Sequence, residues 1–176
     1  MALAPQLNGG TLDGTHVSDV RSRLATPNDL PSIVSVWAEA MDVHANLDPR
    51  FPLSSDASET FTGYLREVLA DENSFLFVTE SNGRIIAYCL ARIGKYPPVF
   101  TKRVYGYIND LMVTAPHRRQ GVGTALFLST AAAIRARGLD VLEVSFVPQN
   151  PMASSFWRKL GFKSRLETLR LDSSAT

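Results

Sequence analysis

The residues best suited to chemistry lie in one segment, residues 110–126, which reads DLMVTAPHRRQGVGTAL. An apolar stretch typical of a strand end is followed by a short loop and then by the small residues of a helix start. The first N–H groups of a helix have no internal partners, and the helix dipole favours negative charge there. Gly121 and Gly123 let a bulky anion approach this backbone, and Arg118 and Arg119 add forked donors. The segment therefore predicts a site for a pyrophosphate or another phosphorylated ligand.

Two familiar phosphate-binding motifs do not match this segment. A P-loop needs Gly-x4-Gly-Lys-Ser/Thr, and the chain has no such run. A dinucleotide-binding fingerprint needs a third glycine where Leu126 stands, and an acidic residue just after the next strand, where residues 144–150 have none. On the glycines alone, a simple turn before a buried helix is an equally good interpretation.

Helical and alternating patterns predict the elements that must position this segment. Pro49 ends a first helix, Asn82-Gly83 indicates a hairpin turn, and Gly138 marks a helix end. We expect a single α/β domain with a mixed sheet flanked by helices over residues 20–172, and tails at 1–19 and 173–176. The expected strands are 20–25, 75–79, 85–93, 104–113, 141–147 and 162–171, and the expected helices begin near residues 28, 55, 117 and 151.

Composition excludes several classes of protein. The chain has 176 residues, a net charge of +1 and a single cysteine. A net charge this close to zero argues against a nucleic-acid-binding domain. A single cysteine excludes an internal disulfide or a Cys-rich metal site. No apolar stretch is long enough to span a bilayer, and no secretory signal opens the chain. We therefore expect a cytoplasmic protein without a metal or a membrane partner.

Two ordered motifs resemble one family. Residues 118–123, RRQGVG, resemble the Arg/Gln-x-x-Gly-x-Gly/Ala signature of the GCN5-related N-acetyltransferase (GNAT) superfamily. Residues 150–162, NPMASSFWRKLGF, look like that superfamily's second block, Asn-x-x-Ala-x-x-Leu/Phe-Tyr-x-Lys-Leu-Gly-Phe. The resemblance implies the acyl-CoA N-acyltransferase fold, in which two neighbouring strands splay apart, here 105–113 and 141–147. It also implies acetyl-CoA as co-substrate and a primary amine as acceptor.

The resemblance carries the cofactor contacts over to particular positions. Buried backbone groups left unpaired by the splayed strands are costly unless a ligand takes them. In this family the pantetheine arm does so, which implies main-chain contacts at Leu111, Met112 and Val113. The pyrophosphate would contact Arg118, Arg119, Gln120, Gly121, Val122, Gly123 and Thr124. Asn150, Ser154 and Trp157 would lie along the cofactor; Asn150 could equally cap the helix that starts at Pro151.

The expected reaction is attack of a neutral amine on the thioester. Removing a proton from an amine with a pKa near 10.4 costs roughly 4.6 kcal/mol at pH 7, so a base is useful. Asp110 is the first candidate, although a structural role is open too. Tyr107 and Asn109, expected together on the other strand face, are candidates for holding a relay water.

One position departs from the family. Trp157 stands where many members have a tyrosine that protonates the leaving thiolate, and an indole is no useful acid. CoA could then leave as a thiolate, helped by water or by Ser154. The alternative is a non-catalytic acyl-CoA-binding or sensing protein of the same fold, and a weaker one is a nucleotide-binding protein that does not use CoA.

The resemblance implies a small-molecule or peptide amine as the acceptor. The loops 44–51 and 95–100 are the expected acceptor site, because loops on a rigid scaffold usually set specificity. His44, Arg50 and Phe51 are the candidate residues there. His44 falls on the apolar stripe of the first helix, and Arg50 would favour an acidic acceptor or cap a nearby carboxylate. Cys89 is expected to be a buried core thiol, and a homodimer is possible.

Overall fold

The computed structural model describes residues 20–47, 52–169 and 171. It contains one five-stranded sheet in the order β1-β2-β3-β4-β5. Neighbouring strands are antiparallel except for β4 and β5, which are parallel. The strands are β1 (Arg21–Leu24), β2 (Ser74–Ser81), β3 (Arg84–Lys95), β4 (Val104–Val113) and β5 (Leu142–Val144).

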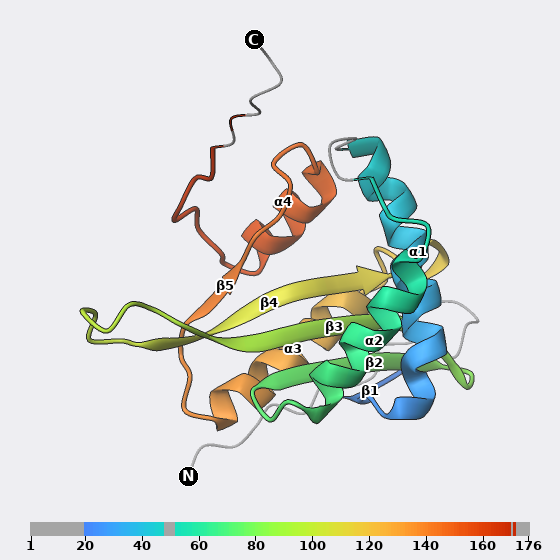
Figure 1. Ribbon diagram of the computed structural model, residues 1–176, viewed down its shortest axis with the longest axis horizontal. Helices are drawn as coiled ribbons and strands as arrows, with labels where there is room; N and C mark the ends of the chain where they lie inside the picture. Colours follow the sequence, from blue (N-terminus) through green and yellow to red (C-terminus); the bar gives the residue numbers. More distant parts are fainter. Residues whose placement is uncertain (1–19, 48–51, 170, 172–176) are drawn as a thin grey trace.

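Helices cover both faces of this sheet (Figure 1). The helices are α1 (Leu30–Leu47), α2 (Ala57–Ala70), α3 (Val122–Ala136) and α4 (Pro151–Lys159). Helices α1 and α2 pack on one face in a core that includes Trp37, Leu65 and Tyr88. Helix α3 packs on the opposite face around Leu126 and Cys89. The expectation of one mixed sheet flanked by helices is confirmed.

The start of α1 is held to the edge of the sheet by charge. The Asp29 carboxylate, in a short 3-10 turn (Pro27–Asp29), accepts two hydrogen bonds from Arg23 on β1, at 2.8 and 2.9 Å, and one from the Thr26 N–H at 2.7 Å. The Arg23 hydrogen bond is the main reason that the pKa of Asp29 is lowered to about 2, and burial partly opposes it. Arg23 also pairs with Glu80 at 3.0 Å. The helix therefore begins where the first strand can anchor it.

A register shift in the middle of β4 decides which side chains share a face. Leu90 of β3 pairs with Asp110, but the next residue, Ala91, pairs with Ile108. Asn109 is therefore an extra residue on β4, as in a β-bulge, and it is exposed. Beyond the shift, Tyr107 pairs with Arg92.

The C-terminal part differs from the expectation in two ways. Strand β5 is shorter than expected, because its pairing with β4 covers three residues only. The strand expected at 162–171 is wrong: the described residues there form no strand, and the segment leads away from the sheet (Figure 1). Leu166 and Leu169 are 82% and 85% exposed, so these side chains are not buried against the sheet. The tails expected at 1–19 and 173–176 lie outside the described residues.

Candidate active site

Strand β4 has a backbone edge that β5 does not cover. Gly106, Tyr107 and Ile108 pair with Leu142–Val144, and the pairing ends there. Residues 110–113 are paired on the β3 side alone in the part of the chain that the structure describes, and Asn109 has no ladder partner there. This is the splay expected of the two strands. Buried or half-buried amides and carbonyls on such an edge are available to a ligand that lies along β4.

The loop after β4 connects this backbone edge to the start of α3. Gly121 is the N-cap of α3 and has φ +84°, a left-handed conformation that favours glycine. A Cβ added to Gly121 would meet nothing within 4 Å, so space is open in front of the helix. Arg119 has φ +63°, which is unusual for a residue with a side chain. A helix N-terminus with open space before it suits an anion, as the sequence predicts.

Arg118 has partners inside the protein. Its Nε donates to the Val113 carbonyl at 2.8 Å, and its Nη2 lies 3.2 Å from Oε1 of Glu39 on α1. The same Glu39 oxygen accepts from the Ala115 N–H at 2.7 Å. Arg118 therefore braces the loop against β4 and α1, and its contact with a pyrophosphate stays a prediction. Sequence reasoning missed Glu39, because nothing local marks a residue 79 positions away as its partner.

Gly123 brings the start of α3 close to β4 and α4. A Cβ on Gly123 would lie 3.4 Å from Leu111 Cδ2 and 3.5 Å from Val113 Cγ2 and Phe156 Cε2. The residues expected to contact the cofactor on β4 and α3 are thus neighbours in space. Phe156, which the sequence did not single out, is the aromatic residue of α4 that reaches this place.

Trp157 lies in the core. It is 5% exposed and packs edge-on against Phe127, Phe156 and Phe162, with ring centroids 4.8 to 5.7 Å apart. A hydrophobic packing role explains a large aromatic residue at this position. Its expected contact with the cofactor stays a prediction.

The N-terminus of α4 is capped by Asn150, whose Oδ1 accepts from the Ala153 N–H at 3.0 Å. The capping role expected of Asn150 is therefore confirmed, while its role toward the cofactor stays a prediction. Ser154, one turn further, is half-buried, and its hydroxyl accepts from Nε of Arg158 at 3.3 Å.

The face of the sheet under α1 and α2 carries a set of polar side chains. Asp110 is half-buried on β4 and faces the same side as Tyr88 of β3, whose hydroxyl is buried with no hydrogen-bond partner among the described residues. Burial, and then the nearby Asp110 carboxylate, raise the pKa of Tyr88 well above 10. Burial and Asp110 also raise the pKa of Tyr64 of α2, while Arg92 opposes this shift.

The bulge corrects one expectation about the catalytic candidates. Tyr107 and Asn109 were expected together on the face opposite Asp110. Tyr107 instead pairs with Arg92, whose guanidinium lies over Tyr64 of α2, so Tyr107 and Asp110 share the α1/α2 face. The extra residue, Asn109, breaks the simple alternation that the expectation assumed.

The residues expected to bind the acceptor lie next to the described residues or outside them. His44 belongs to α1, but its side chain is outside the described part, and Arg50 and Phe51 lie outside the described residues. Cys89 is confirmed as a core thiol: it is fully buried, and this burial is the main cause that raises its pKa to about 12.

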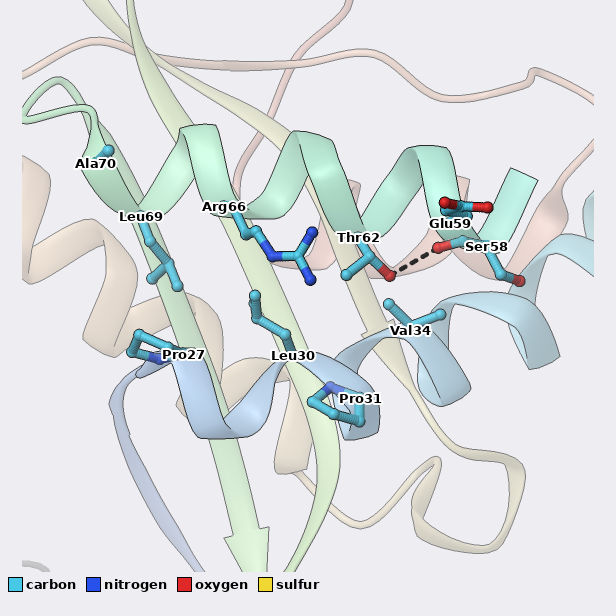
Figure 2. Close-up of a pocket in the computed structure, with 10 residues that line it drawn as sticks. All are labelled: Pro27, Leu30, Pro31, Val34, Ser58, Glu59, Thr62, Arg66, Leu69 and Ala70. Carbon is cyan, nitrogen blue, oxygen red and sulfur yellow. Dashed lines mark hydrogen bonds between the residues drawn. The ribbon is translucent and has the colours of Figure 1, made fainter. Parts of the chain in front are cut away.

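A separate groove runs between the start of α1 and α2 (Figure 2). It has a volume of about 800 Å³, with Leu30 and Val34 on one side and Thr62, Arg66 and Leu69 on the other. None of the residues that line it belongs to the two sequence motifs. The groove is therefore distinct from the edge of β4.

Comparison with known proteins decides the family. The model of the acetyltransferase (GNAT) family matches residues 38–162. The chain belongs to this family. Among curated relatives, it is 28% identical over 104 residues to an N-alpha-acetyltransferase of Sulfurisphaera tokodaii, over 55% of this chain and 61% of the relative. It is also 28% identical over 99 residues to a glucosamine 6-phosphate N-acetyltransferase of Trypanosoma brucei brucei, over 55% of this chain and 63% of the relative.

The chain thus spans about three fifths of the length of these two relatives. A solved structure with the same fold is a predicted acetyltransferase from Clostridium acetobutylicum with acetyl-CoA. It superposes with a TM-score of 0.72 at 20% identity, over 87% of this chain and 96% of that one. This likeness shows the fold.

Two further properties of this GNAT chain concern membranes and metals. No helix in the described ranges is long and apolar enough to cross a membrane. Within the same ranges, no three His, Cys, Asp or Glu side chains gather in a way that could hold a metal ion.

Proposed function

We propose that this GNAT protein is an N-acetyltransferase that moves an acetyl group from acetyl-CoA to a primary amine in a ternary complex. The observation that carries the proposal is the junction of two backbone features. The edge of β4 beyond Ile108 has no strand partner on the β5 side within the described residues, and it leads directly to the open N-terminus of α3. A long ligand with an amide-rich arm and a phosphorylated end is complementary to both features.

The residues present fit acetyl-CoA. The main chain of Leu111, Met112 and Val113 would hold the pantetheine arm, and the amides that follow Gly121 would hold the pyrophosphate. The half-buried position of the three β4 residues supports main-chain hydrogen bonds that water does not weaken. When bound, acetyl-CoA supplies a thioester, whose carbonyl carbon is the electrophile.

Asp110 is the proposed base. It is the carboxylate on the stretch of β4 that precedes the cofactor contacts, and it lies on the face covered by α1 and α2. Asp110 would take a proton from the ammonium form of the acceptor, directly or through a water near Tyr107. The neutral nitrogen would then form a bond to the carbonyl carbon and lose its second proton to water. The carbon–sulfur bond would break, and CoA would leave as a thiolate with the electron pair of that bond.

The binding half of the proposal is tested by calorimetric titration of acetyl-CoA against two matched variants. Gly121→Asp puts a carboxylate where the pyrophosphate should bind, and we expect at least a hundredfold weaker binding. Gly138→Asp is the control: Gly138 follows the other end of α3 and has φ +78°, and a Cβ added there would also meet nothing within 4 Å. Both variants carry similar backbone strain, so equal affinities in the two would refute the assignment of this loop.

The catalytic half is tested by CoA release. We expect that at least one member of a panel of amino acids, peptides, polyamines and amino sugars accelerates thiol release from acetyl-CoA. Tight binding of acetyl-CoA with no acceleration by any amine would instead support a non-catalytic acyl-CoA-binding protein. Equal thermal stabilisation by ADP and acetyl-CoA would support a nucleotide-binding protein.

A further inference from the structure

Arg92 on β3 is a half-buried cation for which no ion pair with a carboxylate is found within the described part of the chain. Its guanidinium lies over the ring of Tyr64 of α2, with Cζ 4.8 Å from the ring centroid. Its Nε is buried and has no hydrogen-bond partner among the described residues. Partly buried arginines are usually paired, because removing a charge from water is costly. Stacking on Tyr64 holds the guanidinium in place, and its Nε donor stays unsatisfied among the described residues.

The nearby acidic group that follows α2 is already used elsewhere. The Asp71 carboxylate accepts from the Ser74 hydroxyl at 2.6 Å and from the Asn73 N–H at 3.0 Å. The Ser74 hydrogen bond is the main cause that lowers the pKa of Asp71, and Arg92 is only a minor one. Asp71 therefore acts on Arg92 at a distance and forms no ion pair with it.

Arg92 and Asp110 face the same side of the sheet. Asp110 pairs with Leu90, which lies two residues before Arg92 on β3. Strand geometry places the Cα atoms of Arg92 and Asp110 roughly 8 Å apart, with both side chains on one face. A base for an amine and a cation with an unsatisfied donor therefore lie within the span of one small molecule.

We propose that Arg92, held by Tyr64, binds a carboxylate group of the amine acceptor, so that the acceptor is an amino acid or a short peptide. The inference rests on the proposed function, because it takes Asp110 as the end of the site that receives the amine. A guanidinium can hold a carboxylate through two parallel hydrogen bonds, which would satisfy the buried Nε.

A carboxylate fits this place better than a phosphate. Phosphate sites usually gather several donors, such as a helix N-terminus and more than one cation. Among the described residues, two charged groups shift the pKa of Tyr64, and they are the Arg92 guanidinium and the Asp110 carboxylate. Arg92 is the one cation of the two. The Asp110 carboxylate would repel a doubly charged phosphate more strongly than a singly charged carboxylate.

The test measures binding and does not depend on turnover. The twenty L-amino acids and their amides are titrated against the protein, with and without CoA, and each acid is compared with its own amide. We expect at least one acid to bind at least tenfold more tightly than its amide. Arg92→Met should abolish this preference by weakening the acid tenfold, and the amide should change less than twofold. Arg84→Met, at the exposed start of β3, is the matched control and should keep the preference.

Arg92→Lys guards against a purely structural effect. Lysine keeps the positive charge but lacks the paired N–H donors of a guanidinium. We therefore expect this variant to fold and to retain part of the preference for the acid. Equal binding of acids and amides by the wild-type protein, or equal weakening of both by Arg92→Met, overturns the inference. Failure of the proposed function would appear differently, as absent binding of acetyl-CoA or absent CoA release, neither of which this titration uses.

Discussion

Glu39 on α1 and Arg118 in the loop before α3 are joined across the end of the sheet, with Oε1 and Nη2 3.2 Å apart. Since Arg118 also donates to the Val113 carbonyl, one side chain connects α1, the end of β4 and the loop that leads to α3. The main chain proposed to bind acetyl-CoA is therefore shaped by a residue of the helix on the α1/α2 face. Binding of the cofactor should depend on Glu39 even though Glu39 is remote in sequence.

Glu39→Gln should weaken acetyl-CoA binding without unfolding the protein. The two side chains of the pair are 27% and 40% exposed, and pairs this accessible contribute at most about 1 kcal/mol to stability. Glutamine can still accept from the Ala115 N–H, but it no longer holds the guanidinium by charge. We expect a three- to tenfold higher Kd for acetyl-CoA by calorimetry and an almost unchanged melting temperature. Glu67→Gln on the exposed side of α2 is the control. An unchanged Kd in Glu39→Gln would show that the brace does not shape the site.

Asp29→Asn should destabilise the fold in a pH-dependent way. The folded-state pKa of Asp29 is lowered to about 2 from 3.8, chiefly by the hydrogen bond from Arg23. A depressed carboxyl pKa stabilises the folded state above the unfolded pKa, and this stabilisation is lost as pH falls through the folded one. We expect a loss of about 2 kcal/mol at pH 7, measured by urea unfolding. The difference between wild type and variant should shrink between pH 5 and pH 2, and a constant difference would contradict the ion pair as its source.

Cys89→Ala should keep the proposed acetyltransferase activity. Cys89 is fully buried, and its burial raises its pKa to about 12, so the thiolate that a nucleophile requires is scarce at neutral pH. We expect turnover within twofold of the wild type and a stability loss of about 1 kcal/mol for the small cavity. In the folded wild type, a thiol reagent at pH 8 should label Cys89 only after denaturant is added. Complete loss of activity in a folded variant would point to a covalent acyl-enzyme instead.

The parts of the site that follow from local sequence could be predicted, and the parts that depend on register could not. The strand end, the glycine loop and the start of α3 are contiguous, so local signals at Gly121 and Pro116 are enough to predict them. The pairing of Tyr107 with Arg92 depends on an extra residue at Asn109, and no composition signal marks it. The Arg92–Tyr64 contact depends on how α2 packs on β3, and no local signal in the sequence marks that packing.

The wrong strand at 162–171 has a related cause. Its apolar residues are compatible with a strand, but a strand also needs a neighbouring strand with which to pair, and local composition does not show whether one lies there. Strand β5 pairs over three residues and then leaves the sheet, and Leu166 stays 82% exposed. The apolar residues of a segment show what it could bury, but the strand that pairs with it must come from elsewhere in the fold.

Asp110→Asn separates the proposed base from a packing role. Asparagine has nearly the same shape but cannot take a proton at neutral pH, and general bases typically contribute a factor of about 10² to 10⁴. With any amine that supports CoA release, we expect kcat to fall at least a hundredfold, while the Kd for acetyl-CoA stays within twofold because its expected contacts on β4 are main-chain. Asp140→Asn is the control, since Asp140 is an exposed carboxylate paired with Lys102 at 2.6 Å. The residual activity of Asp110→Asn should rise with pH, because the fraction of neutral amine then grows without help from a base. A large change in Kd with little change in kcat would instead make Asp110 a structural residue of β4.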